Sequence, residues 1–210
     1  MAVLAIDTAG PVVGVFLDGV ETPFKYTERI TRGAEITVSV AIDRAIKGVS
    51  LSHVVVTVGP GAFTSLRVGV AMALGVATAR KCKVSQVSSL RARAGIAPEG
   101  LTLVMLDGRK GRAYAALYED GVQVSEELDV SPEIAVGLAN GRPFVAVGEG
   151  AEVWREIVES SGGIVSEDAC RPPLEEMVAL SEKSEKVDPQ KVVLNYIREP
   201  DAKLPKSAGV

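Results

Sequence analysis

The feature that most constrains this chain is a strand, a glycine-proline turn and a long uncharged helix, one after another. Residues 52–58 are rich in β-branched side chains, which predicts a buried strand. Gly59-Pro60-Gly61 supplies turn residues, and the apolar run that follows predicts a helix from about residue 66 to residue 80. No residue between Arg67 and Arg80 is charged. The chain must therefore fold in a way that covers an apolar helix on all sides.

Two explanations fit this helix. At about twelve uncharged residues it is too short to span a bilayer, which needs about 20. One of its faces can lie on a sheet, and the other needs a second domain, another helix or another polypeptide. Small residues such as Gly69, Ala73 and Gly75 allow a second backbone to come close. The helix is thus either a central core helix of a large α/β domain or a helix that also meets a partner.

The glycine turn before this helix also fits two uses. A turn between a strand and a helix start leaves backbone N–H groups free, which suits phosphate binding. The same turn also allows close packing, and this structural use is the more common one. Gly59 and Gly61 are candidates for a phosphate contact, with close packing as the alternative.

The composition limits the classes of protein to which this chain can belong. The chain of 210 residues can hold one large or two small domains. Its net charge of −4 argues against tight, independent nucleic-acid binding. Cys82 and Cys170 form no CxxC pair, so neither zinc nor a disulfide framework is indicated. The first residues lack a basic region and reach an acid at Asp7, so we expect a first strand, no signal peptide and a cytoplasmic protein.

A second predicted helix, residues 33–47, carries an unusual pair of apolar side chains. Its main apolar stripe contains Ala34, Val38, Ala41, Ile42 and Ala45. Ile36 and Val40 fall nearly opposite this stripe, where an amphipathic helix is normally polar. Isolated exposed apolar residues are common, but two on one face favour a partner surface.

The chain also repeats one plan about a hundred residues apart. Leu4-Ala-Ile-Asp7, a glycine turn and 16-FLDGV-20 are mirrored by Val104-Met-Leu-Asp107, a glycine turn and 118-YEDGV-122. The repeat predicts two related α/β halves, residues 1–100 and residues 101–210, the second ending in a C-terminal tail. The alternative is a chance similarity of two hairpins.

Residues for catalysis are scarce in this sequence. His53 is the single histidine and has no HxxxH companion, and no Walker loop, GxSxG or GxGxxG occurs. Asp7 and Asp107 each follow a predicted strand and, facing each other across a cleft, could hold a Mg²⁺–nucleotide. Capping a turn is the commoner role of an aspartate at such a position. Arg109, in a basic turn, could reach an anion, with a solvated turn as the alternative.

Together these residues resemble the TsaB (YeaZ) family, a smaller paralogue of the TsaD/Kae1 group in the actin-like ATPase superfamily. The resemblance rests on LAIDT at residues 4–8, on GPGAFTSLRVG at residues 59–69, which is similar to the family's GPGSFTGLRIG, and on VSSL at residues 87–90. DGR at residues 107–109 with Tyr114 is similar to DAR…EVY, and YIR at residues 196–198 to YLR. The resemblance implies two tandem actin-like (ribonuclease H-like) subdomains, each a mixed sheet flanked by helices.

The resemblance also implies a function. Members of this family assist TsaD, together with TsaE, in transferring a threonylcarbamoyl group to the adenosine beside the anticodon of certain tRNAs. TsaD carries its metal through an HxxxH motif that this chain lacks, which fits a non-catalytic partner. Family members pair through their N-terminal halves, with themselves or with TsaD. The family implies that tRNA is reached only through the complex, that no cofactor is intrinsic, and that ATP or ADP binds only at the complex interface.

From the resemblance and the patterns above we expect two sets of site residues and no catalytic or metal-ligating residue. The expected partner surface contains Ile36, Val40, Leu66, Arg67, Val70 and Leu74. A vestigial nucleotide or phosphate site is expected at Asp7, Thr8, Gly59, Gly61, Asp107 and Arg109. The competing hypothesis is an active ATPase or small-molecule kinase of the same superfamily, which predicts ATP binding by the chain alone. A peptidase ranks last, because it needs a catalytic constellation that the sequence lacks.

Overall fold

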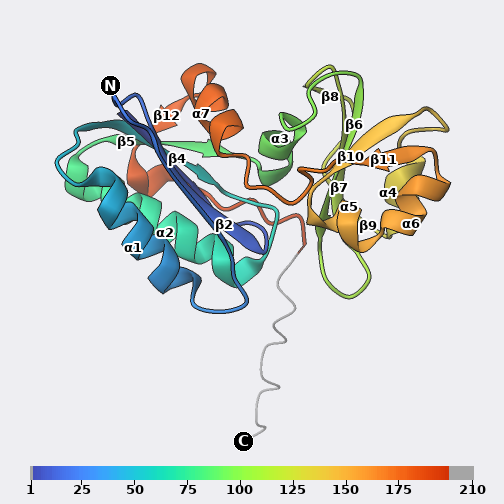
Figure 1. Cartoon of the computed structure of the whole chain (residues 1–210), viewed down its shortest axis with the longest axis horizontal. Coiled ribbons are helices and arrows are strands. Elements are labelled where there is room, and N and C mark those ends of the chain that lie inside the picture. Colours follow the sequence, from blue (N-terminus) through green and yellow to red (C-terminus); the bar gives the residue numbers. More distant parts are fainter. Residues whose placement is uncertain (1, 199–210) are drawn as a thin grey trace, which may run out of the picture.

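The computed structural model describes residues 2–198, which form two α/β subdomains side by side (Figure 1). The strands are β1 (Ala2–Asp7), β2 (Val12–Asp18), β3 (Phe24–Arg29), β4 (Leu51–Thr57), β5 (Lys83–Val87), β6 (Leu101–Asp107), β7 (Ala113–Glu119), β8 (Val122–Gln123), β9 (Leu128–Val130), β10 (Phe144–Val147), β11 (Gly163–Val165) and β12 (Lys186–Val187). The helices are α1 (Ala34–Ile46), α2 (Phe63–Arg80), α3 (Ser89–Ala94), α4 (Pro132–Gly137), α5 (Glu149–Val153), α6 (Arg155–Ser160), α7 (Leu174–Lys183) and the short 3₁₀ helix η1 (Pro189–Lys191).

The first sheet has the strand order β12-β5-β4-β1-β2-β3. Strands β1, β4 and β5 run parallel, and β2 and β3 continue the sheet as antiparallel strands. Its central strands are continuous runs of Val, Leu and Ile because both faces of the sheet are covered. Helices α1 and α2 pack on one face and α7 packs on the other.

The second sheet repeats this plan in the order β11-β10-β6-β7-β8, with β9 also paired to β7. Strands β6, β10 and β11 run parallel, and β6 forms an antiparallel hairpin with β7. In both halves the first strand ends in an aspartate at the hairpin turn, where Asp7 lies opposite Gly14 and Asp107 opposite Ala113. The predicted fold of two related subdomains, each a mixed sheet flanked by helices, is confirmed.

The predicted range for the second half needs a correction. Helix α7 and strand β12 fall within residues 101–210, but they pack on the first sheet. The chain therefore returns to the first subdomain after β11, because α7 covers the face of that sheet that α1 and α2 leave open. The predicted C-terminal tail lies largely outside the described residues.

Residues 192–198 then run along the junction of the two subdomains. This segment joins neither sheet. The backbone N–H of Asn195 donates to the Val58 carbonyl in the first subdomain (2.8 Å). Arg198 is ion-paired with Asp129 in the second, with 2.6 Å between Nε and Oδ2. The segment thus ties the two halves together.

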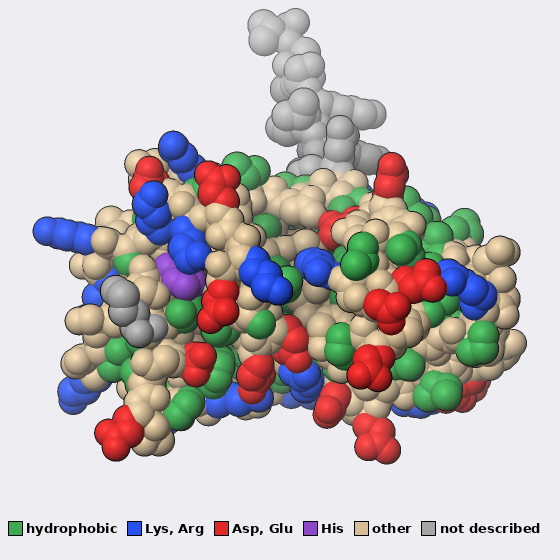
Figure 2. Space-filling view, turned by 90° about the horizontal axis from the view of Figure 1, so that it is seen from above, with side chains coloured by type: hydrophobic (Ala, Val, Ile, Leu, Met, Phe, Trp, Pro, Cys, Tyr) green, Lys and Arg blue, Asp and Glu red, His purple; other side chains and the backbone are tan. Residues whose placement is uncertain are grey.

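Figure 2 shows the side above α3 and α7, where acidic and basic side chains are interspersed. The opposite side carries α1 and α2, which are described below. Within residues 2–198, no helix is both long and apolar enough to cross a membrane.

Candidate functional site

Asp7 lies at the end of β1, and its carboxylate is fully committed to protein partners. Oδ1 accepts hydrogen bonds from the Thr57 hydroxyl (2.7 Å) and from the backbone N–H of Ala9 (3.2 Å). Oδ2 is 2.9 Å from a terminal guanidinium nitrogen of Arg93. Both side chains of this ion pair are buried. Asp7 is therefore neutralised inside the protein and is not presented to a ligand.

Arg93 reaches this position from α3, a short helix whose N-cap is Ser88. The Ser88 hydroxyl accepts hydrogen bonds from the backbone N–H groups of the first turn. Arg93 also donates to the Ser89 carbonyl (3.2 Å). Sequence reasoning missed Arg93, although two arginines two residues apart on so short a helix must point in different directions.

Glu149 completes this cluster from the second subdomain. It is the first residue of α5, and burial raises the pKa of its carboxyl group while the nearby Arg93 cation opposes the rise. The Asp107 backbone also contributes a hydrogen bond that favours the charged form and so lowers this pKa. A protein cation thus lies among acids from both halves of the molecule.

Asp107 caps its own turn, as the structural alternative predicted. Oδ1 accepts from the backbone N–H of Arg109 (2.8 Å), and Oδ2 is 3.1 Å from the Arg109 guanidinium. Asp7 pairs with Arg93, so each aspartate has its own arginine. The two aspartates therefore do not bind one cation together. Within residues 2–198, no group of three or more His, Cys, Asp or Glu side chains is arranged to hold a metal.

The two turn glycines and Thr8 serve close packing. The Thr8 hydroxyl donates to the Ser65 carbonyl (2.7 Å) at the start of α2. Gly59 has a φ of +115°, and a Cβ on it would collide with the Asn195 carbonyl. A Cβ on Gly61 would lie 2.6 Å from the Ala9 carbonyl oxygen. Of the six residues expected at an anion site, Gly61, Asp107 and Arg109 line one pocket, and Asp7 and Thr8 are buried away from it.

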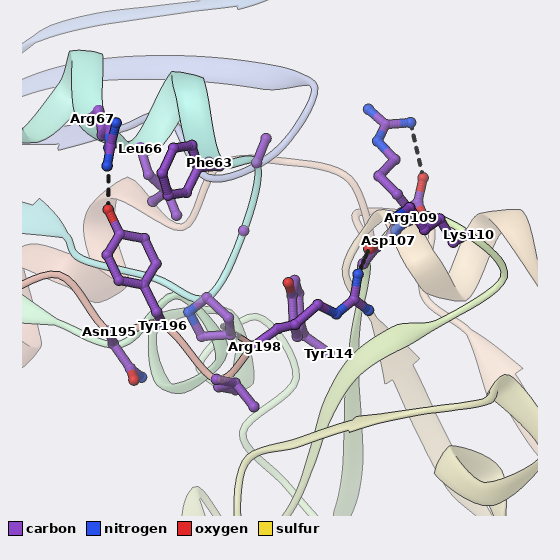
Figure 3. Close-up of a pocket in the computed structure, with 15 residues that line it drawn as sticks. Phe63, Leu66, Arg67, Asp107, Arg109, Lys110, Tyr114, Asn195, Tyr196 and Arg198 are labelled. Atoms are coloured by element: carbon purple, nitrogen blue, oxygen red, sulfur yellow. Dashed lines mark hydrogen bonds and ion pairs between the residues drawn. The ribbon is translucent and has the colours of Figure 1, made fainter. Parts of the chain in front are cut away.

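That pocket lies between the two subdomains and has a volume of about 560 Å³ (Figure 3). It is lined by Pro60, Gly61, Ala62, Phe63, Leu66, Arg67, Asp107, Gly108, Arg109, Lys110, Tyr114, Asn195, Tyr196, Ile197 and Arg198. These come from the start of α2, from the β6–β7 hairpin and from the C-terminal segment. The resemblance singled out Tyr114, Tyr196 and Arg198 as motif residues, but their convergence with Phe63 depends on the tertiary fold.

Ion pairs with the second subdomain fix one wall of the pocket. Both Arg198 and Arg112 donate to Asp129, and these hydrogen bonds hold the pKa of Asp129 below its ordinary value. Arg198 also donates to the Gly108 carbonyl (3.1 Å). On the other wall, the Arg67 guanidinium lies 3.8 Å from the centroid of the Phe63 ring.

The expected partner surface needs two corrections. Leu66 and Val70 are only 1% and 6% exposed. Val70 packs in the core of the first subdomain, and Leu66 lines the pocket between the subdomains. A helix that is apolar all round gives no indication of which face is buried, and the register was therefore misassigned. Both residues are removed from the surface.

The remaining members of that set are accessible. Ile36 is 68% exposed and Val40 is 54% exposed, one turn apart on α1. On α2, Arg67 is exposed and Leu74 is partly buried. We call the outward faces of α1 and α2 the α1–α2 face, defined by Ile36, Val40, Arg67, Ala71, Leu74 and Gly75. Helices α1 and α2 pack against each other on the same face of the first sheet (Figure 1).

Comparisons with known proteins agree with this architecture. The family model described as TsaD, tRNA N6-adenosine threonylcarbamoyltransferase, matches residues 32–195. TsaB of Bacillus subtilis, a "tRNA threonylcarbamoyladenosine biosynthesis protein", is 27% identical over 94% of this chain and 94% of its own length. An uncharacterised protein of Mycobacterium leprae is 35% identical over 96% of this chain, which spans only 56% of that relative. The solved structure of YeaZ from Pseudomonas aeruginosa superposes with a TM-score of 0.79 at 19% identity, covering 93% of this chain and 99% of YeaZ.

The two mixed sheets, each opening with a hairpin whose first strand ends in an aspartate, define an α/β protein of two related subdomains, a fold that it shares with YeaZ. Asp7 and Glu149, one from each subdomain, both lie beside the internal cation of Arg93. The chain belongs to the TsaB (YeaZ) family.

Proposed function

We propose that this chain acts in tRNA threonylcarbamoyladenosine biosynthesis as a non-catalytic activating subunit. In this role it pairs with a TsaD-type catalytic subunit and works together with TsaE, and it reaches tRNA only through the complex. The role needs no cofactor in the chain itself. Family membership supports the process, because the B. subtilis relative is named for it.

The observation that carries the pairing is the α1–α2 face. Ile36 and Val40 expose two branched apolar side chains on one turn of α1. Beside them α2 presents exposed positions without long side chains, Ala71 and Gly75, and nothing lies within 4 Å of a Cβ built on Gly75. Small residues let a partner helix approach closely, and the flanking apolar side chains would be removed from water.

In the absence of a partner, we expect the same face to join two copies of this chain. A second copy offers an identical pair of apolar side chains, so a two-fold arrangement places α1 and α2 against themselves. A TsaD-type subunit would then displace the second copy, because both use one surface.

The test is binding of a TsaD homologue to variants of this face. We expect Ile36→Glu and Val40→Glu to weaken binding about a hundredfold, because a buried unpaired carboxylate costs about 3 kcal/mol or more. Ile164→Glu is the matched control, since Ile164 is 69% exposed but lies on β11 of the other subdomain. Affinity is measured by calorimetry after co-purification. Full binding by folded Ile36→Glu and Val40→Glu proteins would rule out this surface.

A further inference from the structure

Another pocket lies at the end of the α1–α2 face where both helices begin. Its volume is about 580 Å³. The segment that joins β3 to α1, the first turns of α1 and α2, and Arg109 of the β6–β7 hairpin contribute to its lining. In α1 the lining residue Glu35 directly precedes Ile36. In α2 the lining residue Val68 lies one turn before Ala71. The pocket therefore borders the surface that we propose for the partner.

Positive charge predominates in this pocket. Its lining contains three arginines, Arg29, Arg32 and Arg109, and one acid, Glu35. Arg109 is already paired, with 3.1 Å between its guanidinium and Oδ2 of Asp107. Arg29 and Arg32 are exposed, and neither forms an ion pair with another residue of the range 2–198. Two cations in this pocket thus have no acid of the described chain at contact distance.

These two arginines differ from exposed arginines elsewhere in the chain. A guanidinium nitrogen of Arg142, for example, lies 2.9 Å from Oε1 of Glu119. Burial raises the pKa of the Cys170 thiol, while a hydrogen bond with Arg29 opposes the rise. The thiol is therefore neutral and brings no negative charge to Arg29. A close counter-ion for Arg29 and Arg32 has to come from another molecule.

The helix ends at this pocket strengthen the attraction for an anion. Gly33 precedes α1 with a φ of +80°, and Ala62 precedes α2. Neither helix has a side-chain hydrogen bond at its N-terminus. The first backbone N–H groups of both helices therefore lack a side-chain acceptor and carry a partial positive charge. A carboxylate is stabilised at such an end, and here it would also meet the two arginines.

The position of the pocket favours a carboxylate of the partner over a small ion. A partner that packs on the α1–α2 face covers the edge of the pocket and removes water from it. Arginines that lose water without gaining an acid destabilise a complex. An aspartate or glutamate of the partner offsets this cost, and it can bond to an arginine through two parallel hydrogen bonds.

We propose that this pocket receives an acidic segment of the catalytic partner, with a carboxylate against Arg32 and Arg29. This role rests on the proposed function, because it assigns the chemistry that the partner presents beside its apolar contact. The apolar side chains of Ile36 and Val40 supply affinity. The arginines supply selectivity, because a partner with neutral or basic residues at this position would leave two cations covered and unpaired.

A second copy of this chain fits the pocket poorly. In a two-fold pair, the helices of the two copies meet with like ends or with opposite ends together. Like ends bring Arg29 and Arg32 of both copies together. The C-terminal ends of α1 and α2 carry more bases than acids, namely Arg44, Lys47, Arg80 and Lys81 against Asp43. Both arrangements place positive charge against positive charge, so the arginines favour an acidic partner over a second copy.

The experiment measures two affinities of each variant. Affinity for a TsaD homologue is measured by calorimetry, and affinity for a second copy by sedimentation equilibrium. Arg32→Glu should weaken partner binding at least about tenfold and leave self-association unchanged or stronger. Ile36→Glu, in contrast, should weaken both. Arg32→Lys keeps the positive charge and should bind the partner within about fivefold of the wild type. Lys183→Glu, an equal charge reversal on the exposed side of α7, is the matched control and should change neither affinity.

Salt and charge exchange separate an ion contact from lost packing. Partner affinity of the wild type should fall as NaCl rises from about 50 to about 300 mM, and that of Arg32→Glu should fall less steeply. Acids of the TsaD homologue are then changed to lysine one at a time. At least one of these changes should restore binding of Arg32→Glu, because it re-creates the ion pair with its charges exchanged.

Three outcomes would overturn the proposal. The first is wild-type partner affinity and salt dependence in folded Arg32→Glu and Arg29→Glu proteins. The second is binding of inorganic phosphate to the isolated chain at about 1 mM when no lysine variant of the partner restores binding, which would assign the pocket to a free anion. The third is a wild-type chain that does not bind the TsaD homologue, which would overturn the proposed function as well.

Discussion

Replacing Arg93 by methionine tests whether the buried ion pair between α3 and β1 holds this fold together. The guanidinium is 2.9 Å from Oδ2 of Asp7, and neither side chain reaches solvent. Methionine keeps the unbranched stem of the side chain but removes the charge. Asp7 then retains only its bonds from Thr57 and Ala9, and Glu149 loses the cation that lowers the pKa of its carboxyl group.

The expected loss follows from the burial of this pair. Removing one partner of a buried ion pair typically costs about 3–5 kcal/mol, because an uncompensated charge stays inside. The loss should shrink in acid. Without Arg93 the already raised pKa of Glu149 rises further, so the folded variant takes up a proton before the unfolded chain does. Below that pKa the stability difference between the wild type and Arg93→Met narrows by up to about 1.4 kcal/mol per pH unit.

The assay is urea unfolding at pH 7 and pH 5, followed by far-UV circular dichroism and Trp154 fluorescence. Arg142→Met is the control, because Arg142 forms an exposed pair with Glu119 and should cost no more than about 0.5 kcal/mol. A double variant, Asp7→Leu with Arg93→Met, should lose less than the sum of its single changes. Additive losses, or a loss below about 1 kcal/mol for Arg93→Met, would refute the reasoning.

Two further predictions concern α2 and the single histidine. Gly69→Ala should destabilise the chain by about 1–3 kcal/mol, because its Cβ would collide with the Thr8 side chain. Gly75→Ala on the same helix meets open space and should stabilise by about 0.5–1 kcal/mol, with melting temperatures as the measurement. Burial lowers the pKa of His53, whose Nε2 lies 2.9 Å from the Ser181 hydroxyl. His53 is therefore protonated in the unfolded chain first as the pH falls below about 6.5. The free energy of unfolding should drop in this pH range for the wild type but not for His53→Gln. Parallel curves of unfolding free energy against pH for the two proteins would contradict this.

The duplicated architecture could be predicted because it depends on local patterns. The two hairpins end in the same Asp-Gly-Val signal, and the chain pairs them as β1–β2 and β6–β7. The glycine-proline turn and the helix after it also appear, and α2 ends at Arg80 as predicted, but it begins at Phe63, before the predicted start near residue 66. Periodicity placed Ile36 and Val40 outside the core of α1, and both are exposed.

The register of α2 could not be predicted in the same way. Apolar side chains surround this helix, so no face differs in hydrophobicity from another. Leu66 and Val70 are buried because α2 lies across β4 and α1, which is a tertiary contact. The path of the chain after β11 could not be predicted either, because it also depends on tertiary contacts. Nothing in the order of elements indicates that α7 returns to the first sheet.

The candidate sites depended even more on tertiary contacts. Asp7 and Asp107 have equivalent places in the repeat, but their partners differ because Arg93 comes from a helix between the halves. The pocket at the domain junction needs the C-terminal segment, which supplies Tyr196. Charge and motif counting identified some of its members separately and did not bring them together.

The central claim is that this chain works by presenting the α1–α2 face to a catalytic partner. The most direct measurement is the rate of threonylcarbamoyl transfer to tRNA by TsaD and TsaE homologues, with each variant of this chain added. The account predicts that the wild type and Ile164→Glu support the same rate, and that Ile36→Glu lowers it at least tenfold. A folded Ile36→Glu protein that supports the full rate, or a rate independent of this chain, would contradict it.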